Sequence, residues 1–147
     1  AAVRARRAGR DAARFGRLRM TAPPSPGKGR RGIVRLWHAT RYSIAGLHTA
    51  WTGEAAFRQE VLAAVVLLPL ACWLGSNWVE VALLAGSVLV VLITELLNSA
   101  VEAVVDRSGS DWNIHAKRAK DMGSAAVMVS LILAAGVWLA ALWQRLA

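Results

Sequence analysis

The fold is decided by a 26-residue stretch that reads VALLAGSVLVVLITELLNSAVEAVVD, residues 81–106. Its first 14 residues carry no charge, and its second half places Glu95, Glu102 and Asp106 on an otherwise largely apolar background. A helix that crosses a bilayer needs about 20 mostly apolar residues. The uncharged part alone is too short, so a spanning helix here must carry Glu95 and its neighbours to membrane depth.

Two further stretches of the chain are long and uncharged. Residues 61–79 contain 19 consecutive uncharged positions, and residues 122–144 contain 23. Both are about as long as a membrane crossing requires. The sequence therefore predicts an all-α membrane protein with three spanning helices, which we place at about 55–76, 79–105 and 120–144.

The N-terminal part of the chain is strongly basic. Twelve of the 18 Lys and Arg residues lie in the first 41 positions, where Asp11 is the only acid, and the net charge is +9. Such a run can bind nucleic acid. Directly before a membrane domain, however, it more typically contacts anionic lipid and stays on the cytoplasmic side, so we expect no nucleic-acid partner. Residues 1–31 lack apolar periodicity and include the linker-like run TAPPSPGKGRR. We expect them to be disordered, with the membrane domain at 32–147.

The pattern changes between residues 33 and 51. Apolar side chains recur near helical spacing, with basic side chains and histidines between them. This pattern predicts an amphipathic helix that lies on the membrane surface before the first span. The apolar positions are Ile33, Leu36, Trp37, Ile44, Leu47 and Trp51, and the polar ones include Arg35, His38, Arg41 and His48.

The distribution of basic residues predicts the orientation. The turn at 75–80 has no Lys or Arg, whereas the loop at 106–121 has four. Because basic loops stay on the cytoplasmic side, we expect a cytoplasmic N-terminus and an outward-facing 75–80 turn. Tryptophans prefer membrane interfaces, and the seven in this chain agree with that arrangement. Trp73, Trp78, Trp138 and Trp143 fall at the expected outer boundary, and Trp37, Trp51 and Trp112 at the inner one.

The polar residues of the second span share one face. At 100° per residue, Asn98, Glu102 and Asp106 lie at about −60°, −20° and +20° relative to Glu95. Glu95 is about 16 Å deeper along the helix than Asp106. A carboxylate at that depth costs several kcal/mol unless it is paired, protonated or hydrated. One interpretation is a structural hydrogen-bonded seam between helices. We favour a metal or proton-transfer site, for which intramembrane acids are the usual marker.

The predicted topology brings further charged residues to the same leaflet. Glu54 and Glu60 lie at the inner end of the first span, and Lys120 and Asp121 lie at the inner end of the third. With Glu102 and Asp106 they make a site suited to a cation and a phosphate group, because Mg²⁺ commonly bridges one or two carboxylates to substrate phosphates. The sequence contains no phosphate-binding GxxxxGK[ST] loop and no protein-kinase signature. Any phosphoryl transfer would thus depend on carboxylates, magnesium and a few cations.

Three motifs in this order resemble the small prokaryotic membrane diacylglycerol kinases. They read AWTGEAAFRQE at 50–60, ELLNSAVEAVVDRSGS at 95–110 and RAKDMGSAAV at 118–127. The similarity extends over about 35–143, which is essentially the whole membrane domain. It implies a kinase of the bacterial inner membrane that uses ATP and Mg²⁺ to convert diacylglycerol to phosphatidic acid. It also implies a homotrimer whose active sites are shared between neighbouring subunits.

The resemblance also assigns roles to individual residues. It makes Glu95 the catalytic base, supported by Asn98, and it makes Glu54 and Glu102 the ligands of Mg²⁺ with the ATP phosphates. These roles suit phosphoryl transfer, which needs mainly alignment and charge neutralisation. By the same resemblance the nucleotide also contacts Arg35, Tyr42, Asp111, Trp112, Asn113, Lys120 and Asp121, and the lipid contacts Ser43, Trp51, Phe57, Arg58, Glu60, Glu95 and Ser124.

Two other functions remain open from the sequence. Undecaprenol kinase is a related activity of the same fold, although AAFRQE and DRSGS look closer to the diacylglycerol branch. A small non-enzymatic membrane subunit is the other alternative, in which the acids of the second span would form a proton or ion path. Assays of phosphorylation with each lipid alcohol in mixed micelles would distinguish diacylglycerol kinase from undecaprenol kinase. Substitution of Glu95 would distinguish an enzyme from a purely structural subunit.

Overall fold

The computed structural model describes residues 32–107 and 112–147, which form α-helices and no strand. In chain order these helices are α2 (Ile33–Gly53), α3 (Ala55–Leu74), α4 (Trp78–Asp106) and α5 (Ile114–Leu146). The chain divides into two units, Ala1–Thr40 and Arg41–Ala147. The packing described below is that of the second unit. The predicted all-α fold is confirmed for the part of the chain that the structure describes.

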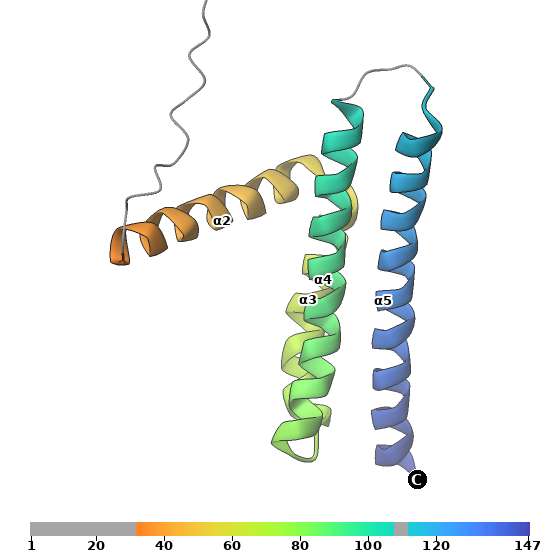
Figure 1. The fold of residues 1–147 in the computed structure, drawn as a ribbon. Coiled ribbons are helices and arrows are strands. Elements are labelled where there is room, and N and C mark those ends of the chain that lie inside the picture. The colour runs from red at the N-terminus through yellow and green to blue at the C-terminus, as the bar shows by residue number, and fades with distance from the viewer. Residues whose placement is uncertain (1–31, 108–111) are drawn as a thin grey trace, which may run out of the picture. The chain divides into compact units, whose positions relative to one another are not determined.

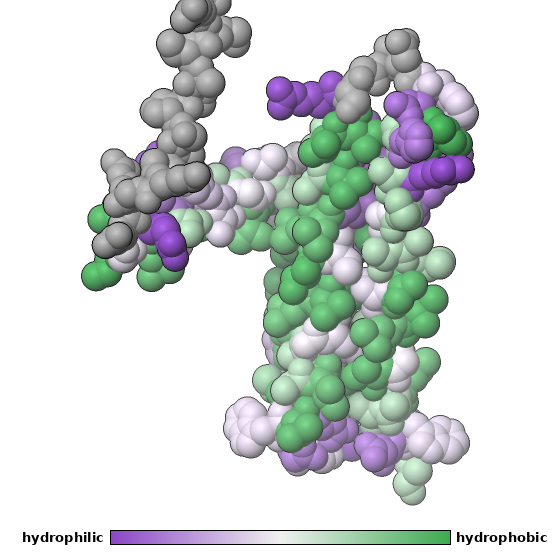
Figure 2. All heavy atoms as spheres, in the orientation of Figure 1, coloured by the Kyte–Doolittle hydropathy of each residue, from purple (hydrophilic) through white to green (hydrophobic). Residues whose placement is uncertain are grey.

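Helices α3, α4 and α5 have the character of membrane spans. Each is long and apolar enough to cross a bilayer, and Figure 2 shows apolar side chains along the helices between polar side chains at their ends. Large apolar side chains on these helices point outward, as Leu62, Val66 and Leu139 do. Because the interior of a soluble domain would bury such residues, this exposure agrees with a surface that meets lipid. The three predicted spans are therefore confirmed.

Helix α4 holds the helices of the second unit together. It packs along both α3 and α5, whereas α3 and α5 contact each other much less (Figure 1). A small apolar core forms where the end of α3, the start of α4 and the end of α5 meet. It contains Ala71, Leu74, Leu84 and Ala141. This core lies at the end of the helices opposite the C-terminus of α4, where the acidic residues gather.

The turn between α3 and α4 is tightly built. Asn77 caps α4, because its Oδ1 accepts hydrogen bonds from the backbone N–H groups of Val79 at 3.0 Å and Glu80 at 3.1 Å. The Glu80 carboxylate accepts a further bond, from the backbone N–H of Ser76 at 2.8 Å. A side chain on Gly75 would meet the backbone nitrogen of Val81 at 2.9 Å. The hairpin therefore needs glycine at position 75 and a capping residue at position 77.

The observed helices begin and end close to the expected positions, with one clear difference. Helix α5 begins at Ile114, six residues before the expected start of the third span at about 120. The Asn113 side chain starts it by accepting a hydrogen bond from the backbone N–H of His115 at 2.8 Å. The extra turns carry Lys117 and Arg118, so the helix begins before the apolar stretch that defined the predicted span.

Candidate functional site

The predicted site centres on the Glu95 side chain, which is only 5% exposed. Its carboxylate lies close enough to those of Glu54 and Glu102 to be repelled by both. Glu60 is near enough to Glu95 for the same kind of repulsion. The carboxylates of Glu54, Glu60 and Glu102 thus all lie within electrostatic range of the Glu95 carboxylate. Such a concentration of negative charge in a poorly hydrated region favours binding of a cation.

Glu54 lies at the corner between α2 and α3, and its carboxylate does not cap α3. It is the N-cap residue of α3, but its side chain makes no capping hydrogen bond. The Arg58 guanidinium holds the corner, because its Nη1 donates to the backbone carbonyls of Trp51 at 3.1 Å and Thr52 at 3.4 Å. These carbonyls belong to the last turn of α2, where helix carbonyls lack partners within the helix. The Glu54 oxygens therefore remain available to a ligand.

Asn98 connects the centre of the site to Glu102. It is half-buried on α4, and its Nδ2 donates a hydrogen bond to Glu102 Oε1 at 3.2 Å. Its Oδ1 is buried and has no hydrogen-bond partner among the described residues. A hydrogen bond donated to a carboxylate fixes its orientation, as the groups that hydrogen-bond to metal ligands do in metal sites.

Two ion pairs lie at the start of α5, next to the acidic residues. Lys120 Nζ lies 2.6 Å from Asp106 Oδ1, which joins α5 to the end of α4, and Lys120 also lies near enough to Glu102 for electrostatic attraction. Lys117 Nζ lies 2.6 Å from Asp121 Oδ2 on the solvent-facing side of α5. Lys120 is therefore the cation closest to the carboxylate cluster among these pairs, and it is placed to attract a phosphate group.

The donor set fits a metal ion that arrives with a phosphate ligand. No group of three or more His, Cys, Asp or Glu side chains is arranged to hold a metal ion within residues 32–107 and 112–147. Mg²⁺ commonly takes one or two protein carboxylates and completes its shell with phosphate oxygens and water. Glu54 and Glu102 supply carboxylates of that kind, since each lies within electrostatic range of Glu95 and the Glu54 side chain makes no capping hydrogen bond.

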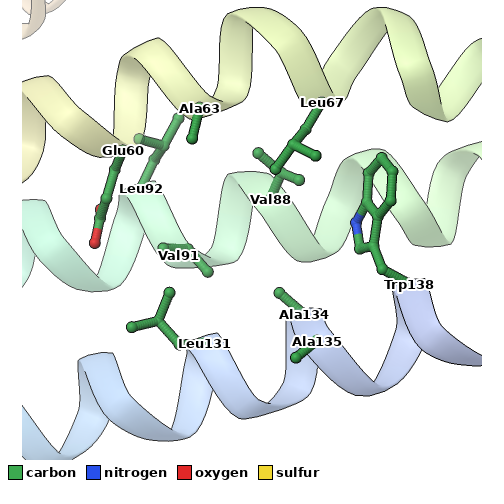
Figure 3. Close-up of a pocket in the computed structure, with 10 residues that line it drawn as sticks. All are labelled: Glu60, Ala63, Leu67, Val88, Val91, Leu92, Leu131, Ala134, Ala135 and Trp138. Atoms are coloured by element: carbon green, nitrogen blue, oxygen red, sulfur yellow. The ribbon is translucent and has the colours of Figure 1, made fainter.

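An apolar cavity of about 330 Å³ lies between α3, α4 and α5, directly beside the acids. Figure 3 shows Glu60 at one end of it and Trp138 at the other. The Glu60 Oε2 and Trp138 Nε1 atoms are buried without a hydrogen-bond partner among the described residues. The rest of the lining is apolar: Ala63, Leu67, Val88, Val91, Leu92, Leu131, Ala134 and Ala135.

The remaining predicted contacts are more scattered. Arg35 belongs to the first unit and is exposed on α2. Asp111 lies outside the described residues. Phe57 is buried at the start of α3, and Asn113 serves as the cap of α5. The others are exposed on their helices or, for Trp112, just before α5: Tyr42, Ser43, Trp51, Trp112, Asp121 and Ser124.

Three structural roles were not predicted from the sequence. Gly123 lets α5 approach the side chain of Asn98, and no local pattern announces such a contact between helices. Arg58 binds the end of α2, which depends on a corner whose angle the sequence does not specify. The capping role of Asn113 had a signal, because Asn directly before an apolar helical run is a common N-cap. The family resemblance assigns that residue only to the nucleotide.

The chain is similar in sequence to several known proteins. The model of the family described as prokaryotic diacylglycerol kinase matches residues 41–142. A diacylglycerol kinase of Escherichia coli (strain K12) is 49% identical over 114 residues, which cover 78% of this chain and 93% of the relative. One from Pseudomonas aeruginosa is 50% identical over 115 residues, covering 78% and 94%. One from Helicobacter pylori is 40% identical over 108 residues, covering 74% and 84%.

Proposed function

This chain belongs to the prokaryotic diacylglycerol kinase family, and on that premise we propose that its acidic site transfers the γ-phosphoryl group of ATP to the free hydroxyl of diacylglycerol. The products are phosphatidic acid and ADP. The observation that carries the proposal is the buried Glu95 carboxylate of α4, with Glu54, Glu60 and Glu102 close enough to repel it. A lipid alcohol reaches this point from the bilayer, and a nucleotide reaches it from water.

Glu95 acts as the general base in this proposal. The hydroxyl oxygen of the lipid attacks the γ-phosphorus, the bond from that phosphorus to the bridging oxygen of ADP breaks, and the hydroxyl proton passes to the Glu95 carboxylate. A base must lie within hydrogen-bonding reach of the proton that it takes. The buried position of Glu95 on α4 suits an acceptor that lies in the membrane rather than in water.

Glu54 and Glu102 would hold Mg²⁺ together with the ATP phosphates. The bound ion would neutralise the charge on the phosphates and align them with the acceptor. Asn98 steadies the Glu102 carboxylate through its hydrogen bond. Lys120 contributes positive charge at the same end of α5. We assign Asp121 and the residues before α5 to the nucleotide, and Phe57, Arg58 and Glu60 to the lipid substrate, on the basis of the family resemblance.

We further propose a trimer in the inner membrane with a cytoplasmic N-terminus. The excess of Lys and Arg in the loop at 106–121 over the turn at 75–80 supports this orientation. The trimer, with active sites shared between neighbours, is supported by the family resemblance and by the large apolar surface that a single copy leaves exposed. Measuring the mass of the purified protein in detergent would test the trimer directly.

The assay that tests this function uses purified protein, ATP and Mg²⁺ in mixed micelles. We expect phosphorylation of diacylglycerol and much slower phosphorylation of undecaprenol. Equal or faster turnover of undecaprenol would assign the chain to the related activity instead. An absence of phosphate transfer to either lipid would reject the kinase assignment for this chain.

Substitution of the proposed base gives the first prediction. Glu95→Gln should lower the rate of phosphorylation by at least about 100-fold, because general-base catalysis contributes about 10²–10⁴, while the oligomer stays intact. Glu80→Gln is the matched control, since Glu80 lies in the turn at the opposite end of α4. Full activity in the Glu95→Gln protein would reject the base, and dissociation of its oligomer would point to a structural seam.

A further inference from the structure

The side chain of Asn98 is held from two helices. On α4, its Nδ2 donates to Glu102 Oε1 at 3.2 Å. On the opposite side, its Oδ1 is buried against the backbone of α5 at Gly123, with no hydrogen-bond partner among the described residues. An amide with one end bonded and the other end enclosed has little freedom to rotate. Its orientation thus depends on the space that α5 leaves for it.

That space exists only because residue 123 has no side chain. A methyl group on Gly123 would occupy the position of Asn98 Oδ1, and it would also approach Asn98 Cγ at 3.3 Å. The other glycines of the two helices differ. Gly86 on α4 and Gly136 on α5 have nothing within 4 Å of an added methyl group. Among these three glycines, Gly123 alone contacts a side chain of the site.

We propose that Gly123 is a positioning residue for the metal–nucleotide site. Its missing side chain lets α5 lie against Asn98 and keeps the Asn98 amide in the orientation that donates to Glu102. This inference rests on the proposed role of Glu102 as a ligand of the metal-bound nucleotide. It adds a residue without a side chain to the part of the site that α5 contributes, beside Lys120 and Asp121.

The geometry separates this role from simple helix packing. The atoms that a methyl group would meet first belong to the amide of Asn98, whereas the Cα atom of Asn98 lies 3.8 Å away, at ordinary contact distance. The side chain can therefore give way while the two backbones stay in place. Alanine also has a higher helix propensity than glycine. Gly123→Ala should consequently fold well and yet lose the bond between Asn98 and Glu102.

The experiment compares four variants of the full chain in detergent micelles: Gly123→Ala, Asn98→Ala, the double variant, and Gly136→Ala as the control. Binding of Mn²⁺ in the presence of ADP is followed by the electron paramagnetic resonance of the free ion. Loss of a group that orients a metal ligand typically weakens metal binding about 10–100-fold, so we expect a weakening of about tenfold for Gly123→Ala. Gly136→Ala should bind as the unaltered protein does.

The double variant decides whether Gly123 acts through Asn98. We expect Asn98→Ala with Gly123→Ala to bind Mn²⁺–ADP no more weakly than Asn98→Ala alone, because the methyl group then displaces nothing. In metal-free protein, the ¹⁵N side-chain amide resonance of Asn98 should shift in Gly123→Ala and stay in place in Gly136→Ala. In kinase assays the KM for the metal–nucleotide should rise, and the KM for the lipid should not.

Several outcomes would overturn the inference. They are unchanged Mn²⁺–ADP binding in Gly123→Ala, additive losses in the double variant, and a Gly123→Ala protein that loses its helical fold. These results are independent of the lipid assay. Failure of the unaltered protein to phosphorylate diacylglycerol would remove the proposed function, whereas the binding and resonance measurements would still report whether Gly123 positions Asn98.

Discussion

At the scale of single residues, the site is built from groups that a stable helical bundle would otherwise avoid. Glu95 is almost fully buried, and an oxygen of Glu60 is buried in an apolar cavity with no hydrogen-bond partner among the described residues. Removing a carboxylate from water without a partner lowers stability. Natural proteins retain such groups mainly where function requires them. The cost at Glu60 is consistent with a polar partner that arrives with the substrate.

A stabilising substitution at Glu60 follows from this cost. Glu60→Leu should raise the thermal midpoint of the helical signal, because an unsatisfied buried polar group costs about 1–3 kcal/mol, and it should lower the rate of lipid phosphorylation. Circular dichroism and the micelle assay measure the two effects. Glu80→Leu is a control of opposite sign, since Glu80 accepts a hydrogen bond from Ser76. A less stable Glu60→Leu protein would contradict the argument.

At the scale of elements, the ends of the helices matter as much as their lengths. Several site residues lie near a helix end, where the backbone needs partners from outside the helix. Arg58 supplies them for α2, and Asn113 supplies one for α5. A change at either end therefore alters both the stability of a helix and the placement of a charged side chain.

The corner between α2 and α3 gives one prediction at this scale. Arg58→Ala removes the donors to the carbonyls of Trp51 and Thr52. The last turn of α2 should loosen, with a loss of about 1 kcal/mol for hydrogen bonds of this kind, and the affinity for Mg²⁺–ATP should fall because Glu54 is no longer held in place. Hydrogen exchange over residues 50–54 is the direct measurement. Unchanged exchange in that segment would refute the role of Arg58.

The start of α5 gives another prediction, which separates two roles of Asn113. Asn113→Ala should destabilise the helix by about 1 kcal/mol, because Asn and Asp are good N-caps and Ala is not. Asn113→Asp keeps the cap, and thermal melting should show no loss. If Asn113 also contacts the nucleotide, the added negative charge should raise the KM for ATP in the Asp variant. An unaltered KM would leave Asn113 with the capping role alone.

The sequence predicted the elements better than their contacts. Unbroken apolar length identified the first and third spans, the second was identified only by placing Glu95 at membrane depth, and the 100° periodicity alone placed Glu95, Asn98 and Glu102 on one face. The extension of α5 back to Ile114 was missed because the added turns are basic, and length arguments consider only apolar residues. The approach of Gly123 to Asn98 joins residues on different helices, and single-sequence periodicity carries no information about such contacts.

At the scale of the whole molecule, the described chain has little interior of its own. Only a few apolar residues are buried, and many large apolar side chains of α3, α4 and α5 are exposed. Lipid can cover such a surface, as can further copies of the chain. The basic extension before residue 32 adds charge without adding any of the carboxylates of the site. The catalytic chemistry should therefore reside in the helices alone.

Truncation tests this division. Removal of residues 1–31 should leave the rate of diacylglycerol phosphorylation in micelles within about twofold of the full chain, because none of the assigned site residues lies in this segment and salt screens its charges. Vesicles that contain anionic lipid should bind the truncated chain less strongly than the full chain, because the truncation removes most of the basic residues. A loss of activity in uncharged micelles would show that the extension contributes to the site, and retention of nucleic acid by the full chain would support a nucleic-acid partner for the basic run.

The small core of Ala71, Leu74, Leu84 and Ala141 lies at the opposite end of the helices from the acids. Together with the capped turn at Asn77, this core should make that end the most stable part of the three-helix unit. Thermal opening should start at the acidic end, where the carboxylates repel one another. We therefore expect the three helices to separate first at the acidic end, which would allow nucleotide exchange. The apolar core at the other end keeps them together meanwhile.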